Sequence, residues 1–116
     1  MPRTIWKYDV LPGDFGLDMP KGAKILGVGL QGGKPHRIYT GRVTIMDEGA
    51  SAWGAEGPRL WALVDPEAPK VCRRFIAVGT GDLFPEEIDG FSHIGTFVLM
   101  GGRLVFHVFD AGELSP

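Results

Sequence analysis

The sequence predicts a single domain that is all β or nearly so, built as a small β-sandwich or a partly open barrel of roughly six to eight short strands. Apolar residues come in short runs that alternate with polar residues, which is the period of a half-buried strand. Eighteen glycines and nine prolines separate these runs, as expected for tight turns between strands. With 44% hydrophobic residues among 116, the chain can build one core without disulfides or a metal.

Three strands are expected in the first third of the chain, over residues 5–10, 15–19 and 23–31. Turn residues bound them, because Pro12–Asp14 interrupts the first run and Pro20 stops the second. The third run contains Gly27 and Gly29, and glycine inside a strand often marks a bulge or a place where a ring packs closely. A turn at Gly32–Gly33 is expected to follow it.

The composition changes over about residues 35–59 of the single domain. Tyr39, Val43 and Ile45 predict an added strand over about residues 36–46. The following residues 47–59 are small and polar, with Trp53 as their only large apolar side chain. We therefore expect a flexible, exposed loop there.

Two more strands and one helical turn are expected before the C-terminal hairpin. Leu60–Val64 is a continuous apolar run, which predicts a strand buried on both faces. Lys70–Val78 is the next strand and ends at Gly79–Gly81. Pro85–Asp89 predicts a short helical turn, with proline in its first position and acidic residues near its positive end.

The clearest element is a hairpin over Ser92–Asp110 that turns at Gly101–Gly102. This turn places Thr96 opposite His107, and it makes both faces of the hairpin apolar. Because two apolar faces cannot both meet water, we expect a second covering layer or a contact with another subunit. The candidate interface residues on the second face are Ile94, Val98, Val105, His107 and Phe109.

Chemical motifs are sparse, and no catalytic residue is assigned. The segment Gly79–Asp82 resembles a phosphate-binding loop without the Lys-Ser/Thr pair that such a loop needs. The expected register places His93 opposite Asp110, like a base and its orienting acid, but no nucleophile in an activating motif accompanies them. The candidates for a small enzyme or ligand binder are therefore Gly79, Gly81, Asp82, His93 and Asp110.

No metal site and no cofactor are expected from this register. It places His93 and His107 on opposite faces of the hairpin, whereas zinc needs three or four converging ligands. The single cysteine, Cys72, excludes an intramolecular disulfide and fits a reducing compartment.

The charge balance disfavours nucleic-acid binding, because a net charge of −2 gives no long-range attraction to phosphates. A nucleic-acid-binding module remains the second alternative, using Arg37, Arg42, Arg73, Arg74 and Arg103. Arg73 and Arg74 are adjacent in a strand and so point to opposite faces, which does not make one basic cleft. Without a signal-peptide pattern or a membrane-spanning apolar run, we expect a cytoplasmic protein with no membrane partner.

The combined pattern resembles a family of short uncharacterised proteins of tailed bacteriophages and bacterial prophages. The matching segments are IWKY near the N-terminus, MPKGAKIL at Met19–Leu26, LWALVDPEAPK at Leu60–Lys70, GTG at Gly79–Gly81 and GG-x-LVFHVF at Gly101–Phe109. The chain departs from the family by its extra segment near residues 35–59. The resemblance implies a bacterial cytoplasmic setting and carries no activity, cofactor or catalytic residue.

The expected function is a non-enzymatic accessory protein that acts through protein–protein interaction. The hairpin with two apolar faces predicts a homo-oligomer, most simply a dimer, and the resemblance implies a further host or phage protein as partner.

Overall fold

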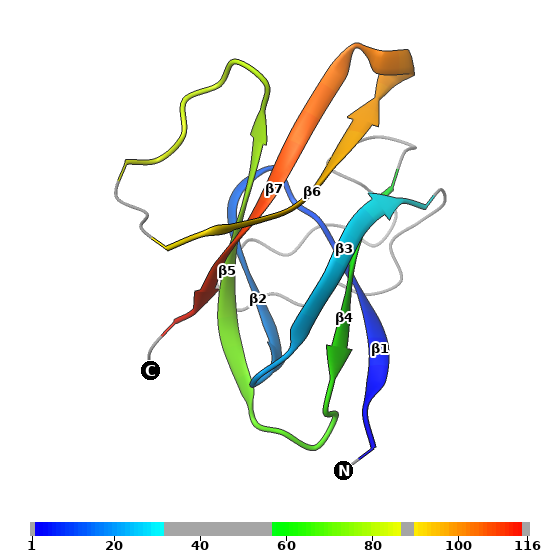
Figure 1. The fold of residues 1–116 in the computed structure, drawn as a ribbon, viewed down its shortest axis with the longest axis vertical. Helices are drawn as coiled ribbons and strands as arrows, with labels where there is room; N and C mark the ends of the chain where they lie inside the picture. Colours follow the sequence, from blue (N-terminus) through cyan, green and yellow to red (C-terminus); the bar gives the residue numbers. More distant parts are fainter. Residues whose placement is uncertain (1, 32–56, 87–89, 115–116) are drawn as a thin grey trace.

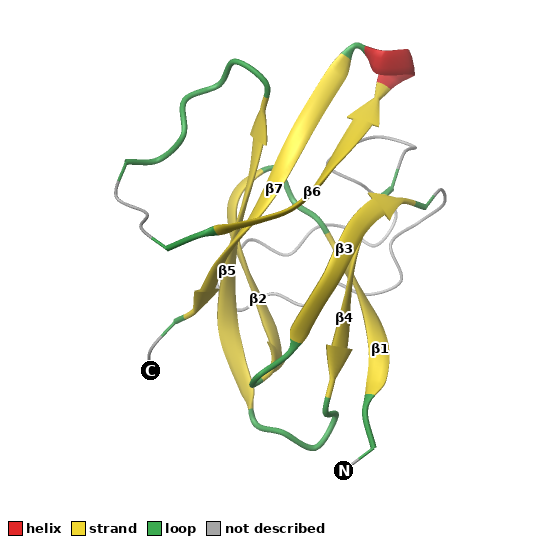
Figure 2. Cartoon of the chain, viewed as in Figure 1, coloured by secondary structure: helices red, strands yellow, loops and turns green. Residues whose placement is uncertain are grey.

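The computed structural model describes residues 2–31, 57–86 and 90–114. Within these ranges the chain is almost entirely β, in agreement with the predicted class (Figures 1 and 2). The strands are β1 Thr4–Asp9, β2 Gly13–Pro20, β3 Lys24–Leu30, β4 Pro58–Val64, β5 Lys70–Gly79, β6 Ser92–Leu99 and β7 Leu104–Glu113, with a 3₁₀ turn η1 at Met100–Gly102. All three strands predicted in the N-terminal third are present, with boundaries shifted by one or two residues.

The strands form two antiparallel sheets that face one another as a sandwich. One sheet has the order β1-β4-β3 and the other the order β2-β5-β7-β6. The two sheets are separate hydrogen-bonded units. Of the two expected architectures, the structure therefore has the β-sandwich. Strand β4 is central in its sheet, as its apolar run predicted, although Trp61 and Leu63 on its outer side are only partly buried.

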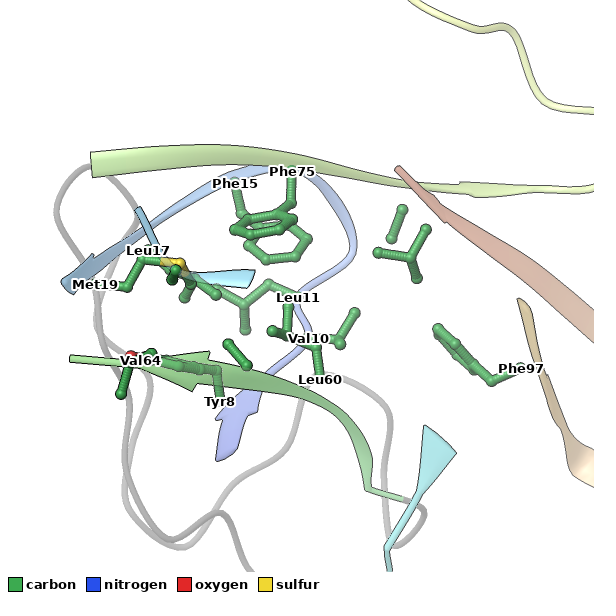
Figure 3. Close-up of a cluster of buried hydrophobic side chains, with 14 of the residues drawn as sticks. Tyr8, Val10, Leu11, Phe15, Leu17, Met19, Leu60, Val64, Phe75 and Phe97 are labelled. Atoms are coloured by element: carbon green, nitrogen blue, oxygen red, sulfur yellow. The ribbon is translucent and has the colours of Figure 1, made fainter. Parts of the chain in front are cut away.

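The core lies between the sheets and is formed by residues that alternate along the strands. In Figure 3 the rings of Phe15 and Phe75 lie one over the other beneath β5, with a centroid separation of 5.6 Å. The buried hydrophobic cluster comprises Tyr8, Val10, Leu11, Phe15, Leu17, Met19, Ala23, Leu60, Ala62, Val64, Phe75, Ala77, Phe97, Leu99 and Val108. Both sheets contribute to this single cluster, so the described strands form one domain.

The glycines of β3 have the two roles that strand glycines commonly have. A bulge separates Ile25 from Gly27 in the pairing with β4, so that Leu26 is the additional residue. At Gly29, an added Cβ would lie 3.4 Å from the ring of Trp61, which shows how closely that ring approaches the backbone.

The β6–β7 hairpin turns at the predicted glycines. Gly101 and Gly102 have φ angles of 64° and 96°, a region that favours glycine and is typical of two-residue hairpin turns. The predicted pairs Phe97 with Phe106 and Thr96 with His107 are both present. The local turn chemistry therefore sets the register over the outer half of the hairpin.

The predicted register is wrong beyond Gly95, because β6 contains a bulge between His93 and Gly95. Ile94 is the additional residue, so His93 pairs with Phe109 and Ser92, rather than His93, pairs with Asp110. A one-residue shift exchanges the two faces of a strand. Ile94 accordingly packs against the core, and the expectation that it belongs to the second, outward face is wrong.

An ion pair between Asp9 and Arg59 is buried, which the alternating pattern did not predict. The two residues are cross-strand partners in β1 and β4, and Arg59 Nε lies 3.1 Å from Asp9 Oδ1. Both residues are buried, although Arg59 belongs to the segment that was expected to be an exposed loop. Charged groups are buried in proteins chiefly when they are paired, as these are.

The two sheets approach closely where Gly95 of β6 meets Val28 of β3. An added Cβ at Gly95 would lie 2.4 Å from Val28 Cγ2, too close for any real contact. Gly95→Ala is therefore expected to lower the free energy of unfolding by about 1–3 kcal/mol through overpacking. Urea denaturation of Gly95→Ala, Val28→Ala and the double variant measures this. We expect the loss of unfolding free energy in the double variant to be smaller than the sum of the two single losses by at least about 1 kcal/mol. Additive effects of the two substitutions would contradict the contact.

Three predictions fall on residues outside the described ranges. They are the turn at Gly32–Gly33, the inserted strand and most of the loop over residues 35–59, and residues 87–89 of the helical turn expected at 85–89. In the described part of these segments, Pro58 and Arg59 belong to β4.

Candidate functional site

The outward side of the β6–β7 hairpin carries a set of apolar, aromatic and neutral polar side chains. Phe97, Leu99 and Val108 point into the core, and the residues that alternate with them point away from it. Together with two phenylalanines of the preceding loop they form what we call the hairpin outer face, which comprises Phe84, Phe91, His93, Thr96, Val98, Val105, His107 and Phe109. In Figure 1 this hairpin extends beyond the other strands at the top of the molecule.

Aromatic rings occupy one end of the hairpin outer face. The ring of Phe109 lies edge-on to those of Phe84 and Phe91, with centroids 5.1 and 5.3 Å away. Phe84 and Phe91 are themselves 4.6 Å apart, and the His93 ring lies 5.3 Å from that of Phe109. The loop before β6 thus covers part of the second apolar face, as a covering layer was expected to do. The cover is incomplete, because Phe91 remains 43% exposed.

A hydrogen-bonded series of threonines and histidines crosses the centre of the hairpin outer face. Thr96 Oγ1 lies 3.0 Å from His93 Nε2 and 3.0 Å from His107 Nδ1. On the other side of the His107 ring, Nε2 lies 2.7 Å from Thr80 Oγ1. The two imidazole centroids are 6.2 Å apart. The prediction that His93 and His107 lie on opposite faces is therefore wrong, and the bulge at Ile94 is the reason.

Threonine hydroxyls lie at both nitrogens of the His107 ring. Thr80 Oγ1 is at Nε2 and Thr96 Oγ1 is at Nδ1, and the Thr80 hydroxyl also lies 3.5 Å from the Val105 carbonyl oxygen. The two threonines therefore set the orientation of the His107 ring.

The Gly79–Asp82 segment forms a tight turn beside this series. Asp82 N–H donates to the Gly79 carbonyl oxygen over 3.0 Å, and Gly81 has a φ angle of 93°. An open pocket of about 370 Å³ adjoins the turn and is lined by Gly79, Thr80, Asp82, Arg103, Leu104, Val105 and Phe106. The candidate residues Gly79 and Asp82 therefore line a concave surface, with Arg103 from the hairpin tip on it as well.

Asp110 is not the partner of His93. Its carboxylate accepts two hydrogen bonds from Arg73, at 3.1 Å from Nε and 2.6 Å from Nη2, and a third from the Gly112 N–H at 2.9 Å. Arg73 also donates to the Ala23 carbonyl oxygen. The predicted pairing of His93 with Asp110 is wrong, because the bulge moves His93 by one position and Arg73 engages the carboxylate.

The comparison with protein families gives one match. Residues 1–115 match the model of a domain of unknown function, DUF7352. The chain belongs to this family. No curated protein matches the chain, and no solved structure matches it.

The arginines of this DUF7352 domain that lie in the described ranges are not gathered into one cleft. Arg73 pairs with Asp110, whereas its neighbour Arg74 pairs with Asp14, in agreement with the expected opposite directions. Arg103 lies at the hairpin tip, and Arg37 and Arg42 lie outside the described residues. Cys72 is a free, partly buried thiol.

Several residues of the DUF7352 site were missed by the sequence analysis. Thr80 and Thr96 hold the two histidines, and Phe84 and Phe91 complete the aromatic end. A usable signal was present for Thr96, since it was predicted opposite His107. No such signal was present for Thr80, Phe84 or Phe91, because their positions depend on how the segment between β5 and β6 folds back onto β7.

The hairpin outer face offers apolar rings and aliphatic side chains for contact, and hydroxyls and imidazoles for hydrogen bonding. Among the described residues, no three His, Cys, Asp or Glu side chains gather in a way that could hold a metal ion. In the same part of the chain, no helix has the length and hydropathy that a membrane span requires.

Proposed function

We propose that this DUF7352 domain is a non-enzymatic interaction module that binds a second copy of itself through the hairpin outer face. The observation that carries the proposal is the exposure of apolar side chains there. Val98 is 45% exposed and Phe91 43% exposed, and the adjacent Leu83 is 95% exposed. Apolar side chains that are exposed on one face in this way are typical of protein interfaces.

The absence of charge on the hairpin outer face favours a second copy as the occupant. None of its eight residues carries a carboxylate, ammonium or guanidinium group. In a two-fold symmetric contact each residue meets the same surface of the other copy, so a charged patch would repel itself. A neutral face with aromatic rings avoids this repulsion and loses little hydration free energy when it is buried.

The alternative functions have less support from the contacts. A hydrolase-like use of His93 would need an orienting acid, and Asp110 is engaged by Arg73 instead. Nucleic-acid binding would need unpaired cations on one surface, whereas Arg73 and Arg74 each bind a carboxylate. The resemblance to phage and prophage proteins supports a bacterial cytoplasmic setting and a further host or phage partner, which we include in the proposal.

Sedimentation equilibrium in EDTA tests the self-association. We expect the wild-type chain to be a dimer at about 20 µM, an ordinary affinity for a modest interface. Val98→Asp places a carboxylate at the centre of the contact and is expected to weaken dimerisation at least about 100-fold, the cost of burying an unpaired charge.

The matched control is Ile5→Asp, which makes the same kind of change at a 56% exposed position of β1 in the other sheet. It is expected to leave the dimer intact. A wild-type chain that stays monomeric at 200 µM, or a dimer that Ile5→Asp disrupts and Val98→Asp spares, would overturn the proposal. Circular dichroism of both variants confirms that the fold is retained.

A further inference from the structure

The hairpin outer face presents two imidazoles that converge on one point. His93 Nε2 and His107 Nδ1 each lie 3.0 Å from Thr96 Oγ1, so they are separated by no more than twice that distance. Two nitrogen ligands of a tetrahedral zinc ion are about 3.3 Å apart, given Zn–N distances of about 2.0–2.1 Å. For both nitrogens to bind one ion they must approach one another, and the Thr96 hydroxyl that lies between them must move aside.

The surroundings of His107 are those of a metal ligand. Its Nε2 lies 2.7 Å from Thr80 Oγ1, and its Nδ1 lies 3.0 Å from Thr96 Oγ1. A ligating histidine usually donates its other ring N–H to a fixed partner, which sets its tautomer and orientation. Within the described residues, the polar contact of His93 is the one from Nε2 to Thr96 Oγ1. Imidazole nitrogen suits zinc and related transition-metal ions rather than magnesium or calcium.

One chain supplies only half of such a site. Zinc sites in proteins use three or four protein ligands, and the described residues offer no third group here. The Thr96–His107 pair lies between Val98–Val105 toward the hairpin tip and His93–Phe109 toward the base. It therefore lies near the middle of the hairpin outer face, where a two-fold axis relating two copies would bring the two histidine pairs together.

We infer that His93 and His107 form half of a zinc site that a second copy completes, giving four imidazole ligands across the proposed dimer. This inference rests on the proposed function, since the same face must pair with itself. Because the four ligands are neutral, the bound ion keeps its full charge. The hairpin outer face has no acidic residue that could offset this charge. Zinc bound in this way tightens the dimer, because it binds the paired state and not the single chain.

Sedimentation velocity of the full chain with EDTA, with zinc chloride and with magnesium chloride tests the site. Zinc is expected to lower the dimer dissociation constant at least about tenfold relative to EDTA, whereas magnesium, which prefers oxygen ligands, leaves it unchanged. Equilibrium dialysis with atomic absorption is expected to find one zinc ion per two chains.

His93→Gln and His107→Gln are each expected to abolish the zinc effect, read as the ratio of the dimer dissociation constants of the same variant in EDTA and in zinc chloride. Glutamine retains a side-chain amide that can bond Thr96, so the fold is expected to survive. His36→Gln alters the remaining histidine of the chain and is the matched control, with the zinc effect retained.

The outcomes separate this inference from the proposed dimer. A chain that dimerises in EDTA and ignores zinc overturns the zinc site alone. A chain that is monomeric in EDTA and pairs with zinc supports the zinc site and overturns the proposed apolar dimer. A zinc effect that persists in both His93→Gln and His107→Gln, or one zinc ion per chain, overturns the shared site.

Discussion

Phe75→Ala is expected to lower the free energy of unfolding by about 3–5 kcal/mol, the largest effect of any single substitution proposed for this domain. Phe75 is fully buried in β5 and its ring stacks on that of Phe15 in β2, so truncation removes apolar burial and leaves a cavity between the sheets. Most small domains have a total stability of about 5–15 kcal/mol, so the variant is expected to be partly unfolded at 37 °C. Urea denaturation followed by fluorescence of the three tryptophans measures the loss.

The matched control is Leu83→Ala, which truncates a large apolar side chain that is 95% exposed. It is expected to change the free energy of unfolding by less than about 0.5 kcal/mol. Both variants are measured in the Val98→Asp background, so that any loss of dimer does not contribute to the apparent stability. Equal effects of the two substitutions would show that Phe75 is not in the core.

Asp110→Ala is expected to lower the free energy of unfolding by about 3 kcal/mol. The substitution leaves the Arg73 guanidinium without its carboxylate in a site where the side chains are only 15% and 10% exposed. Loss of one partner from a buried, doubly hydrogen-bonded ion pair typically costs about 3–5 kcal/mol, because the remaining charge is unpaired and poorly hydrated. The Gly112 N–H loses its acceptor as well.

Asp14→Ala is the control, because Asp14 binds the adjacent Arg74 in the same doubly hydrogen-bonded way at a more exposed position. The side chains of that pair are 28% and 44% exposed, and solvent screening reduces the expected loss to less than about 1 kcal/mol. The two substitutions each remove a carboxylate from one of two neighbouring arginines of β5, so their difference reports burial together with the Gly112 hydrogen bond that Asp110 accepts. A loss at Asp14 as large as that at Asp110 would contradict this account.

The strands and the hairpin turn could be predicted from the sequence because they depend on local chemistry. Alternation of apolar residues and the positive φ angles at Gly101 and Gly102 are properties of a few adjacent residues. The two-layer arrangement followed from the same alternation, since each strand has a side that must be covered. The pairs from Leu99–Leu104 to Thr96–His107 then followed from the turn by counting.

The candidate site could be predicted only in part, because one residue of β6 shifts its register. The bulge at Ile94 occurs where Gly95 lies against Val28 of the other sheet, a contact between residues far apart in sequence. No periodicity within β6 reports that contact. The errors about His93, Asp110 and Ile94 all have this one cause.

The charged pairs were missed for a related reason. Asp110 and Arg73 are 37 residues apart, and Asp9 and Arg59 come from strands separated by most of the chain's first half. In a sequence pattern each of these side chains is simply polar and is assigned to solvent. Only the pairing of the strands places each charge beside its opposite and allows it to be buried.

The bulge at Ile94 also bears on how copies of this domain avoid polymerising. Strand β6 is an edge of its sheet in the described part of the chain, and regular edge strands can add further strands without limit. At Ile94 the backbone N–H and C=O groups of β6 are irregularly spaced. A regular strand therefore cannot form hydrogen bonds along the whole of β6. Extension of this sheet by another strand beside β6 is thereby disfavoured.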